Sequence, residues 1–358
     1  MKAFAVKRYH KVLIMGRITI QQVADKAGVS PATVSRVLND KASQMVSEAT
    51  RERVITSASE LGYQPSAAAR AMATGRTWVV AIACEQVTQP NFVRMIEAAR
   101  DLVAARGYHL LLASEAKDHG AAVAALLGQR QADIVLHVMY PVERVDEYAD
   151  TVSSPRQRLV ALGPMAEAPP LKVMSAYWDD RRGIHKAVGH LAGLGHRRVA
   201  FLAGSVGRYK QQAFEAASAE NGIEHLSISH EDDSDQLAAG GEMAAQALAS
   251  RPRPTAILAR NDQFAIGALP ALAAAGLSVP EDISLIGYND TPVAAYTTPA
   301  LTTIRTPVVE AAEAVLRSAM VSLDESPDDG QPDVHSFGFD TRLVVRDSTG
   351  PPPADHGR

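Results

Sequence analysis

Residues 18–40, ITIQQVADKAGVSPATVSRVLND, decide the fold of the N-terminal part of the chain. Thr19, with a glutamine three positions later, predicts a capped helix start, because both side chains can bond free backbone N–H groups there. Gly28 predicts the end of that helix in a tight turn. Ser30 followed by Pro31 predicts a second start, since proline at the first helical position loses no hydrogen bond. The stretch therefore predicts two short helices joined by a turn.

The second of these helices is expected to be small and polar on its outer side. Its apolar positions, Val34, Val37 and Leu38, are expected to point into a three-helix core. A third helix, capped by Ser47, is expected to add Val54, Ile55, Ala58 and Leu61. Two short helices joined by a glycine-containing turn are typical of a helix-turn-helix, whose second helix enters the major groove of DNA. Arg36 on that helix can reach O6 and N7 of guanine. An ordinary three-helix bundle with a solvated arginine stays open on pattern alone.

Charge divides the chain into two parts. Residues 1–77 carry 12 Lys and Arg against 5 Asp and Glu, although the whole chain has a net charge of −4. A basic head on an acidic body indicates that the head meets a polyanion. The lone cysteine, Cys84, excludes an internal disulfide framework and is typical of a reducing cytoplasm. A run of about eighteen apolar residues is absent, and the N-terminus lacks the apolar segment of a secretory signal.

From Trp78 onward, short apolar runs alternate with amphipathic helices, which predicts parallel sheets covered by helices. The first set of such units ends with RLVAL (158–162), and a second set begins with a helix near 180–194. Two sets predict two similar doubly wound lobes. Ligands collect beyond the carboxyl ends of parallel strands, and this rule selects Glu85, Met139-Tyr140, Ser205, Asn261-Asp262 and Asn289-Asp290.

The predicted organisation has five parts. These are a disordered extension (1–17), a helix-turn-helix domain (18–63), a hinge (64–77), an effector-binding and dimerisation domain (78–347) and a disordered tail (348–358). The large domain is expected to hold lobe 1 (about 78–175 plus 305–333) and lobe 2 (about 176–304 plus 334–347). The hinge helix is too short to be stable alone and is expected to order when two copies pack on DNA. The tail contains no heptads, so a C-terminal coiled coil is not expected.

Residues 18–77 resemble the head of the lactose/galactose repressor (LacI/GalR) family through residues 18–40, VSEATRERV and ELGYQPSAAARAMATGRT. The segments LAGLGHRRVAFLAG, ARNDQFAIGALPALAAAGLSVPEDISLIGYND and TPALTTIRTP resemble the family's body. The resemblance implies an all-α helix-turn-helix head on an α/β periplasmic-binding-protein-like body. It also implies a cytoplasmic homodimer that binds a near-palindromic DNA operator, commonly as a repressor, under the control of a sugar or related metabolite.

The resemblance also implies which residues contact DNA. Its base-reading positions fall on Pro31, Ala32 and Arg36, and the first two can offer only apolar contact. Its phosphate-contacting positions fall on Thr19, Ser30, Thr33, Ser35, Asn39, Ser47, Thr50 and Tyr63. In the hinge, the DNA-contacting positions fall on Ala69 and Met72. Met72 stands where the family inserts a leucine wedge into the minor groove, and methionine can act similarly.

The effector-contacting positions implied by the resemblance are Glu85, Met95, Met139, Trp178, Lys210, Asn261 and Asn289. Lys210 stands where the family has an arginine, and Asn289 replaces an aspartate, although Asp290 is retained beside it. Lysine cannot reproduce the planar fork of arginine, so these changes argue against a simple neutral sugar. Two structural alternatives stay open, in which Trp178 belongs to the core and Glu85 pairs with Lys210.

Other classes of protein find less support in the sequence. No Walker phosphate loop, HExxH or GxSxG motif occurs, so no enzyme, metal or cofactor is predicted. The neighbouring carboxylates Asp179 and Asp180 are expected to cap a helix rather than to act as a catalytic pair. A solute-binding protein of the cell envelope would share the body but not the basic head. A regulator that binds DNA without any effector, its cleft vestigial, remains the alternative.

Overall fold

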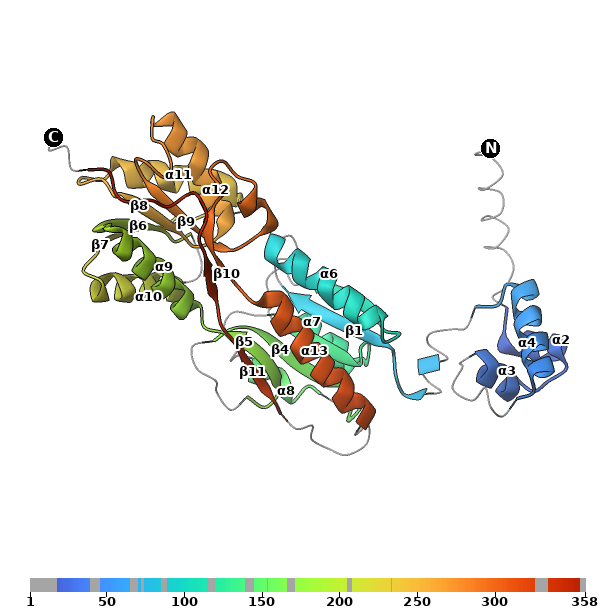
Figure 1. Cartoon of the computed structure of the whole chain (residues 1–358). Coiled ribbons are helices and arrows are strands. Elements are labelled where there is room, and N and C mark those ends of the chain that lie inside the picture. The colour runs from blue at the N-terminus through green and yellow to red at the C-terminus, as the bar shows by residue number, and fades with distance from the viewer. Residues whose placement is uncertain are drawn as a thin grey trace, which may run out of the picture. The chain divides into compact units, whose positions relative to one another are not determined.

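The chain divides into two compact units between Thr77 and Trp78. The computed structural model describes residues 18–38, 46–64, 70–71, 74–84, 89–114, 120–138, 145–152, 154–165, 171–204, 208–232, 234–325 and 334–354. Within these ranges every helix is too short or too polar to cross a membrane. Figure 1 shows the elements of both units along the chain.

Between residues 18 and 64, the described part of the head unit contains the helices α2 (Ile20–Ala27), α3 (Pro31–Leu38) and α4 (Glu48–Leu61). The predicted capping box is present at the start of α2. The backbone N–H of Thr19 donates to the side-chain oxygen of Gln22 at 2.8 Å, and the N–H of Gln22 donates to the Thr19 hydroxyl at 3.4 Å. Gly28 ends α2 with a φ of 67°, which a residue without Cβ adopts freely. The two predicted helix starts and the turn between them are confirmed.

The core of the head is apolar and small, and it consists of Val23, Ala24, Ala27, Val34, Val37, Val54 and Ala58. One predicted core position is wrong, because Ile55 is 47% exposed. The inward face of α4 repeats every three or four residues through Val54, Ser57, Ala58 and Leu61. Position 55 falls outside that face.

The first lobe of the body is built on a six-stranded parallel sheet of order β11-β5-β4-β3-β1-β2. Its strands are β1 (Val79–Cys84), β2 (His109–Ser114), β3 (Ile134–Val138), β4 (Arg158–Pro164), β5 (Met174–Trp178) and β11 (Ser336–Phe339). One face is covered by α6 (Pro90–Ala104) and α13 (Val308–Glu325), the other by α7 (Ala121–Gly128) and α8 (Asp146–Ala149). The central strand β1 is apolar throughout because helices cover both faces.

A second sheet, of order β12-β10-β9-β8-β6-β7, forms the other lobe and is parallel except for β12. Its strands are β6 (Arg198–Leu202), β7 (Glu224–Ile228), β8 (Ala256–Ala259), β9 (Ser284–Asn289), β10 (Thr302–Arg305) and β12 (Arg342–Val344). One face packs against α9 (Asp180–Leu194) and α10 (Arg208–Glu220), the other against α11 (Gln236–Ala249) and α12 (Asp262–Ala274). Figure 1 shows the two lobes end to end, with β10 leading from one to the other.

The chain passes between the lobes after β5, after β10 and between β11 and β12. The predicted lobe boundaries are wrong at two places. No strand was predicted at β5, yet its residues 176–178 pair with β4 in the first sheet. Residues 336–339 also belong to the first sheet, because β11 pairs in parallel with β5 rather than continuing into the second lobe. Residues 336–344 therefore contain two strands, one in each lobe.

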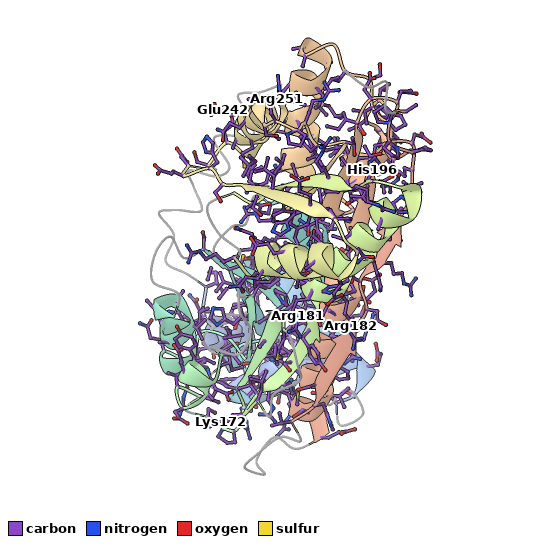
Figure 2. The ribbon with its side chains drawn as sticks, turned by 90° about the vertical axis from the view of Figure 1, so that its left-hand side faces the viewer. Lys172, Arg181, Arg182, His196, Glu242 and Arg251 are labelled. Carbon is purple, nitrogen blue, oxygen red and sulfur yellow. The ribbon has the colours of Figure 1, made fainter. Side chains whose placement is uncertain are left out.

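The predicted disordered tail is wrong for residues 348–354, which pack on the second lobe. Ser348 is fully buried, and its hydroxyl donates to the carbonyl of Leu285 at 2.6 Å. The ring of the buried His196 bonds the carbonyl of Gly350 at 2.9 Å and the hydroxyl of Ser284 at 3.0 Å. Figure 2 places His196 in the second lobe, on the far side of Arg181 and Arg182 from Lys172 of the first lobe. The small hydroxyl side chains of this segment find hydrogen-bond partners inside the lobe, and these bonds hold the segment in place.

Candidate nucleic-acid interface and effector site

The outer surface of α3 is narrow and carries one long side chain. Ala32 and Arg36 are both exposed, and their spacing of four residues places them on the same side of the helix. Ser30 caps α3, since the N–H of Thr33 donates to its hydroxyl at 3.2 Å. The remaining predicted DNA contacts on this helix are half-buried: Pro31, Thr33 and Ser35. Arg36 is therefore the side chain of α3 with the reach and charge to bond a base edge in the major groove.

Hydroxyl side chains mark the starts of α2, α3 and α4. Thr19, Ser30 and Ser47 precede α2, α3 and α4, and the hydroxyl of Thr50 lies 2.9 Å from that of Ser47. The free N–H groups and the dipole at a helix start attract phosphate. Tyr63 follows α4 and packs against the core of the head. Three predicted DNA contacts lie outside the described residues: Asn39, Ala69 and Met72.

The structure separates the predicted effector contacts. Asn261 and Asn289 lie at the carboxyl ends of strands in the second sheet, as the strand-end rule predicts, whereas Lys210 lies in the first turn of α10. Met95 and Trp178 are 0% and 1% exposed and belong to the core of the first lobe. Two further contacts, Glu85 and Met139, lie outside the described residues.

Asp180 is the centre of a buried polar cluster, called here the Asp180 cluster, that consists of Trp178, Asp180, Tyr209, Lys210 and Tyr288. Its carboxylate accepts from the Trp178 indole, the Tyr209 hydroxyl and the Tyr288 hydroxyl, each at 2.8 Å. The Lys210 ammonium lies 3.3 Å from the same carboxylate, whose side chain is 2% exposed. Trp178 ends a strand of the first lobe, so the carboxylate links it to three residues of the second.

Lys210 is therefore bound to Asp180. Its ammonium also lies 3.6 Å from the centre of the Tyr288 ring, within the range of a cation–π interaction. Burial lowers the pKa of Lys210, while Asp180 opposes that shift and the nearby Arg260 adds to it. Burial, together with Asp180, raises the pKa of the Tyr288 hydroxyl well above its ordinary value, so the tyrosine stays a donor. Lys210 therefore stabilises this edge of the second lobe. Its ammonium group already has Asp180 and Tyr288 as partners on one side.

Sequence reasoning missed most of this cluster. Asp179 caps α9 as expected, accepting from the N–H of Arg181 at 2.9 Å. Asp180 does not cap the helix but turns inward, which neighbouring positions on a helix allow because their side chains point in different directions. The signal that could have indicated its role is a Trp at the end of a strand two residues before a carboxylate. Tyr209 and Tyr288 gave no such signal.

Asn261 and Asn289 present the second lobe's amide groups at this edge. The Asn261 oxygen accepts from the N–H of Phe264 at 3.0 Å and caps α12, and its amide nitrogen donates to Gln236 at 2.8 Å. Arg260, just before it, is 8% exposed and lies 5.1 Å from the Phe264 ring centre. Asn289 is half-buried. Amides beside cations can bond hydroxyl, carbonyl or anionic groups of a small molecule.

Asp262 anchors the backbone behind these amides. Burial raises its pKa to about 6, although hydrogen bonds from the hydroxyl of Thr303 and the N–H and hydroxyl of Thr291 oppose the shift. These bonds measure 2.5 Å from Thr303 and 2.6 and 2.9 Å from Thr291. The carboxyl is completely buried and points to threonines. It therefore positions the segment after β9 rather than contacting a ligand.

We expect Gly183→Ala in α9 to destabilise the second lobe by about 1–3 kcal/mol, the usual cost of overpacking. A Cβ at this position would lie 2.5 Å from the Tyr288 hydroxyl and 3.0 Å from the Thr341 hydroxyl, so it would displace the Asp180 cluster. Gly189 lies in the same helix, and a Cβ there would meet no atom of another element within 4 Å, so Gly189→Ala should instead stabilise by up to about 1 kcal/mol. Urea unfolding of both variants measures the difference, and equal effects would contradict the close packing at Gly183.

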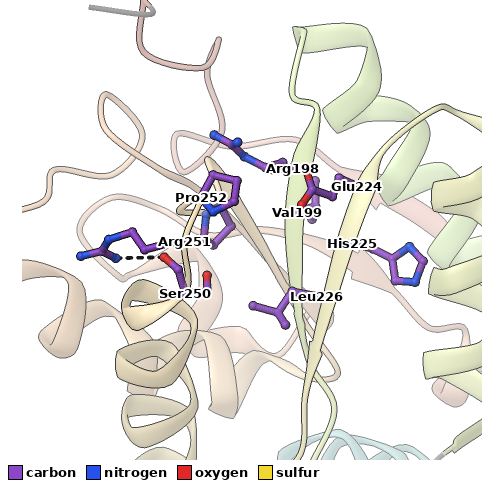
Figure 3. A pocket seen from close by; sticks show the side chains of 9 residues that line it. Arg198, Val199, Glu224, His225, Leu226, Ser250, Arg251 and Pro252 are labelled. Atoms are coloured by element: carbon purple, nitrogen blue, oxygen red, sulfur yellow. Dashed lines mark hydrogen bonds between the residues drawn. The ribbon is translucent and has the colours of Figure 1, made fainter. Parts of the chain in front are cut away.

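A shallow cavity of about 140 Å³ opens at the opposite edge of the second sheet. Figure 3 shows it between the starts of β6 and β7 and the loop after α11, lined by Arg198, Glu224 and Arg251 among others. Arg251 donates to the Ser250 carbonyl at 2.9 Å. Because this cavity lies at the amino ends of the strands, it is separate from the edge that carries Asn261 and Asn289.

Comparison with known proteins agrees with this two-part architecture. Residues 19–66 match the model of bacterial regulatory proteins of the lacI family, and residues 188–349 match the periplasmic binding protein-like domain. The chain is 34% identical over 346 residues to the HTH-type transcriptional regulator GalR of Escherichia coli (strain K12), covering 93% of this chain and 96% of GalR. It is 32% identical over 308 residues to the HTH-type transcriptional repressor PurR of Serratia proteamaculans (strain 568), covering 81% and 85%.

Solved structures show the same fold. The lac repressor dimer bound to operator and the anti-inducer ONPF matches with a TM-score of 0.79 at 24% identity, over 94% of this chain and all of that one. The complex of the transcriptional regulator CelR with cellobiose matches with a TM-score of 0.63 at 26% identity, over 93% and 100%. A helix-turn-helix head followed by a periplasmic-binding-protein-like body defines a DNA-binding transcriptional regulator. The chain belongs to the LacI family.

Proposed function

We propose that this regulator represses transcription by binding a near-palindromic operator as a homodimer, and that a small molecule in the body controls its affinity for DNA. The observation that carries the proposal is the capped α3 helix with exposed Ala32 and Arg36, in a chain whose body has the fold of a binding protein. Arg36 would read a base pair, with Pro31 and Ala32 in apolar contact. The head hydroxyls, with Asn39 and Tyr63, would bond phosphates, and Ala69 and Met72 of the hinge (64–77) would meet the minor groove.

Exposed apolar side chains in both lobes support the dimer. On the edge strand β2, Leu111 and Leu112 are 39% and 46% exposed, and Val93 on α6 is 42% exposed. In the second lobe, Val293 of the short helix η3 (Pro292–Ala295) is 47% exposed and Tyr296 is 85% exposed. Exposed apolar edge strands promote association. Two-fold pairing through these surfaces would present two heads to a two-fold operator.

The proposed effector site is the carboxyl edge of the second sheet, where Asn261 and Asn289 supply amides and Arg260 and Lys210 supply positive charge. Glu85 and Met139 would complete it from the first lobe. This composition suits a hydroxylated metabolite, such as a sugar or a sugar derivative. The named relatives are transcriptional regulators, and we propose that this chain likewise catalyses no reaction and acts in the cytoplasm.

A second function keeps the DNA-binding role but has no effector. It is favoured by the burial of Met95 and Trp178 and by the pairing of Lys210 with Asp180, which leave fewer predicted contacts for a ligand. In that case the body would serve dimerisation alone. The two functions differ in whether the body binds a small molecule.

A thermal-shift screen of sugars, sugar acids, nucleosides and polyols distinguishes them. A ligand at 100 times its dissociation constant stabilises the protein by about 2.7 kcal/mol, and we expect at least one class to raise the melting temperature. The same compound should change the affinity for DNA from upstream of the protein's own gene by about 5- to 150-fold. Asn261→Ala should abolish both effects, and a screen without any stabilising class would favour the effector-free function.

A further inference from the structure

Asp290 lies where the second lobe meets helix α6 of the first. Its carboxylate accepts from Arg305 at 2.6 Å and from Arg346 at 2.5 Å, and its side chain is 4% exposed. Burial alone would raise the pKa of Asp290, but the hydrogen bonds from Arg346 and Arg305 hold it below its ordinary value. The side chain is therefore an ionised, fixed anchor at the end of β9.

Arg94 connects this anchor to the other lobe. From α6 its guanidinium donates to the backbone carbonyl of Asp290 at 3.1 Å. One turn earlier in the same helix, the buried Asn91 amide donates to the hydroxyl of Thr306, on the segment that leads from β10 back to the first lobe, at 3.1 Å. Together these bonds fix the start of α6 against the carboxyl edge of the second sheet.

The backbone that carries this contact is unusual. Asn289 has a φ of 104° and Asp290 a φ of 53°, two consecutive residues with a Cβ in the left-handed region. Such conformations are unfavourable and persist only where the surroundings hold them. Two sets of hydrogen bonds stabilise the conformation here. Arginines donate to the Asp290 carboxylate, and the N–H and hydroxyl of Thr291 donate to Asp262. The carbonyl of Asp290, in the peptide bond to Thr291, thus accepts from Arg94, and Asn289 lies one residue earlier at the proposed effector edge.

We propose that Arg94 is a positioning residue, which couples effector occupancy at Asn289 to the relative arrangement of the lobes through the strained two-residue segment Asn289-Asp290. The inference rests on the proposed function, because Asn289 is an effector contact only there. A ligand bound to the Asn289 amide acts on a backbone segment whose φ values are unfavourable for residues with a Cβ. A small shift of this segment therefore breaks or shortens the hydrogen bond from Arg94 to Asp290. Packed interfaces respond to such shifts by switching between arrangements rather than by continuous deformation.

The test measures the distance between the lobes directly. Spin labels are placed at Ala104→Cys on α6 and Ala245→Cys on α11, both exposed positions, in a Cys84→Ala background. Labelled chains are mixed with an excess of unlabelled protein, so that distances within one chain dominate. Arg94→Ala should broaden and shift the distribution of distances, and Arg94→Lys, which keeps a donor, should stay close to the parent. Arg100→Ala is the matched control, because this exposed arginine of the same helix pairs with its neighbour Asp101.

A second variant tests the backbone part of the proposal. Asn289→Gly removes the conformational constraint at a φ of 104°, so it should broaden the same distribution although Arg94 is intact. If Arg94→Ala has the same distance distribution as the parent, Arg94 does not position the lobes. If Asn289→Gly has the parent distribution, the strained segment does not couple Asn289 to the lobe arrangement. Neither measurement uses DNA or an effector. A failure of the proposed function would appear instead as a protein that binds no operator or no ligand while these distances still change.

Discussion

Replacing Arg36 with alanine is expected to remove the preference of the protein for one base pair of its operator, a loss of about 1–3 kcal/mol. The physical reason is the shape of α3, where Arg36 projects beside a side chain as short as Ala32. A bidentate contact of arginine with guanine is the usual source of such discrimination. Fluorescence anisotropy against the operator and its single-base variants measures the preference at fixed salt, since salt changes every affinity.

Arg53→Ala is the matched control for this prediction. It removes the same charge from α4, where Arg53 lies 3.5 Å from the Thr50 hydroxyl and is exposed. This variant should weaken binding to all sequences alike, if it weakens binding at all, and leave the base preference intact. If Arg36→Ala also weakens all duplexes by one common factor, Arg36 contacts the phosphate backbone and not a base.

The second large effect is expected from Asp180→Ala, which should lower the free energy of unfolding of the body by about 3–5 kcal/mol. The substitution leaves the Lys210 ammonium buried without its counter-charge, and it also removes the acceptor of Trp178, Tyr209 and Tyr288. Removing one partner of a buried pair costs more than the pair itself contributes. Urea unfolding followed by Trp fluorescence gives the free energy and also reports on the indole of Trp178.

Two comparisons isolate the cause. Asp179→Ala, at the neighbouring position, removes only a helix cap and should cost about 1 kcal/mol. The double variant Asp180→Ala with Lys210→Met should recover part of the loss, because the buried charge is then gone. An Asp180→Ala variant as stable as Asp179→Ala would show that water reaches the cluster and satisfies it.

The elements that were predicted correctly are those defined by local signals. The capping box at Thr19 and the turn at Gly28 depend on residues within a few positions of each other, so their interactions form in almost any context. The helices and strands of the second lobe follow from alternating apolar runs in the same way. Strands β5 and β11 were misassigned because five or four residues of mixed character become strands only when a neighbouring strand supplies their hydrogen bonds.

The candidate sites also differ in how far local sequence signals predict them. The exposed face of α3 could be predicted, because helical periodicity alone decides which residues point outward. The roles of Trp178 and Lys210 could not, because Asp180 collects donors from β5, α10 and β9, far apart along the chain. Nor does any local pattern show that Asn289 and Asp290 adopt positive φ values, which arginines at 305 and 346 hold in place.

The amino-acid sequence by itself determined the kind of protein: a capped helix-turn-helix head, two α/β lobes and a basic surface for DNA. Only the tertiary structure decided which polar side chains bond to one another inside the body and which hold the lobes together. The reason is that helix starts and periodicity depend on neighbours in sequence, whereas the environment of a buried charge depends on every element that packs around it.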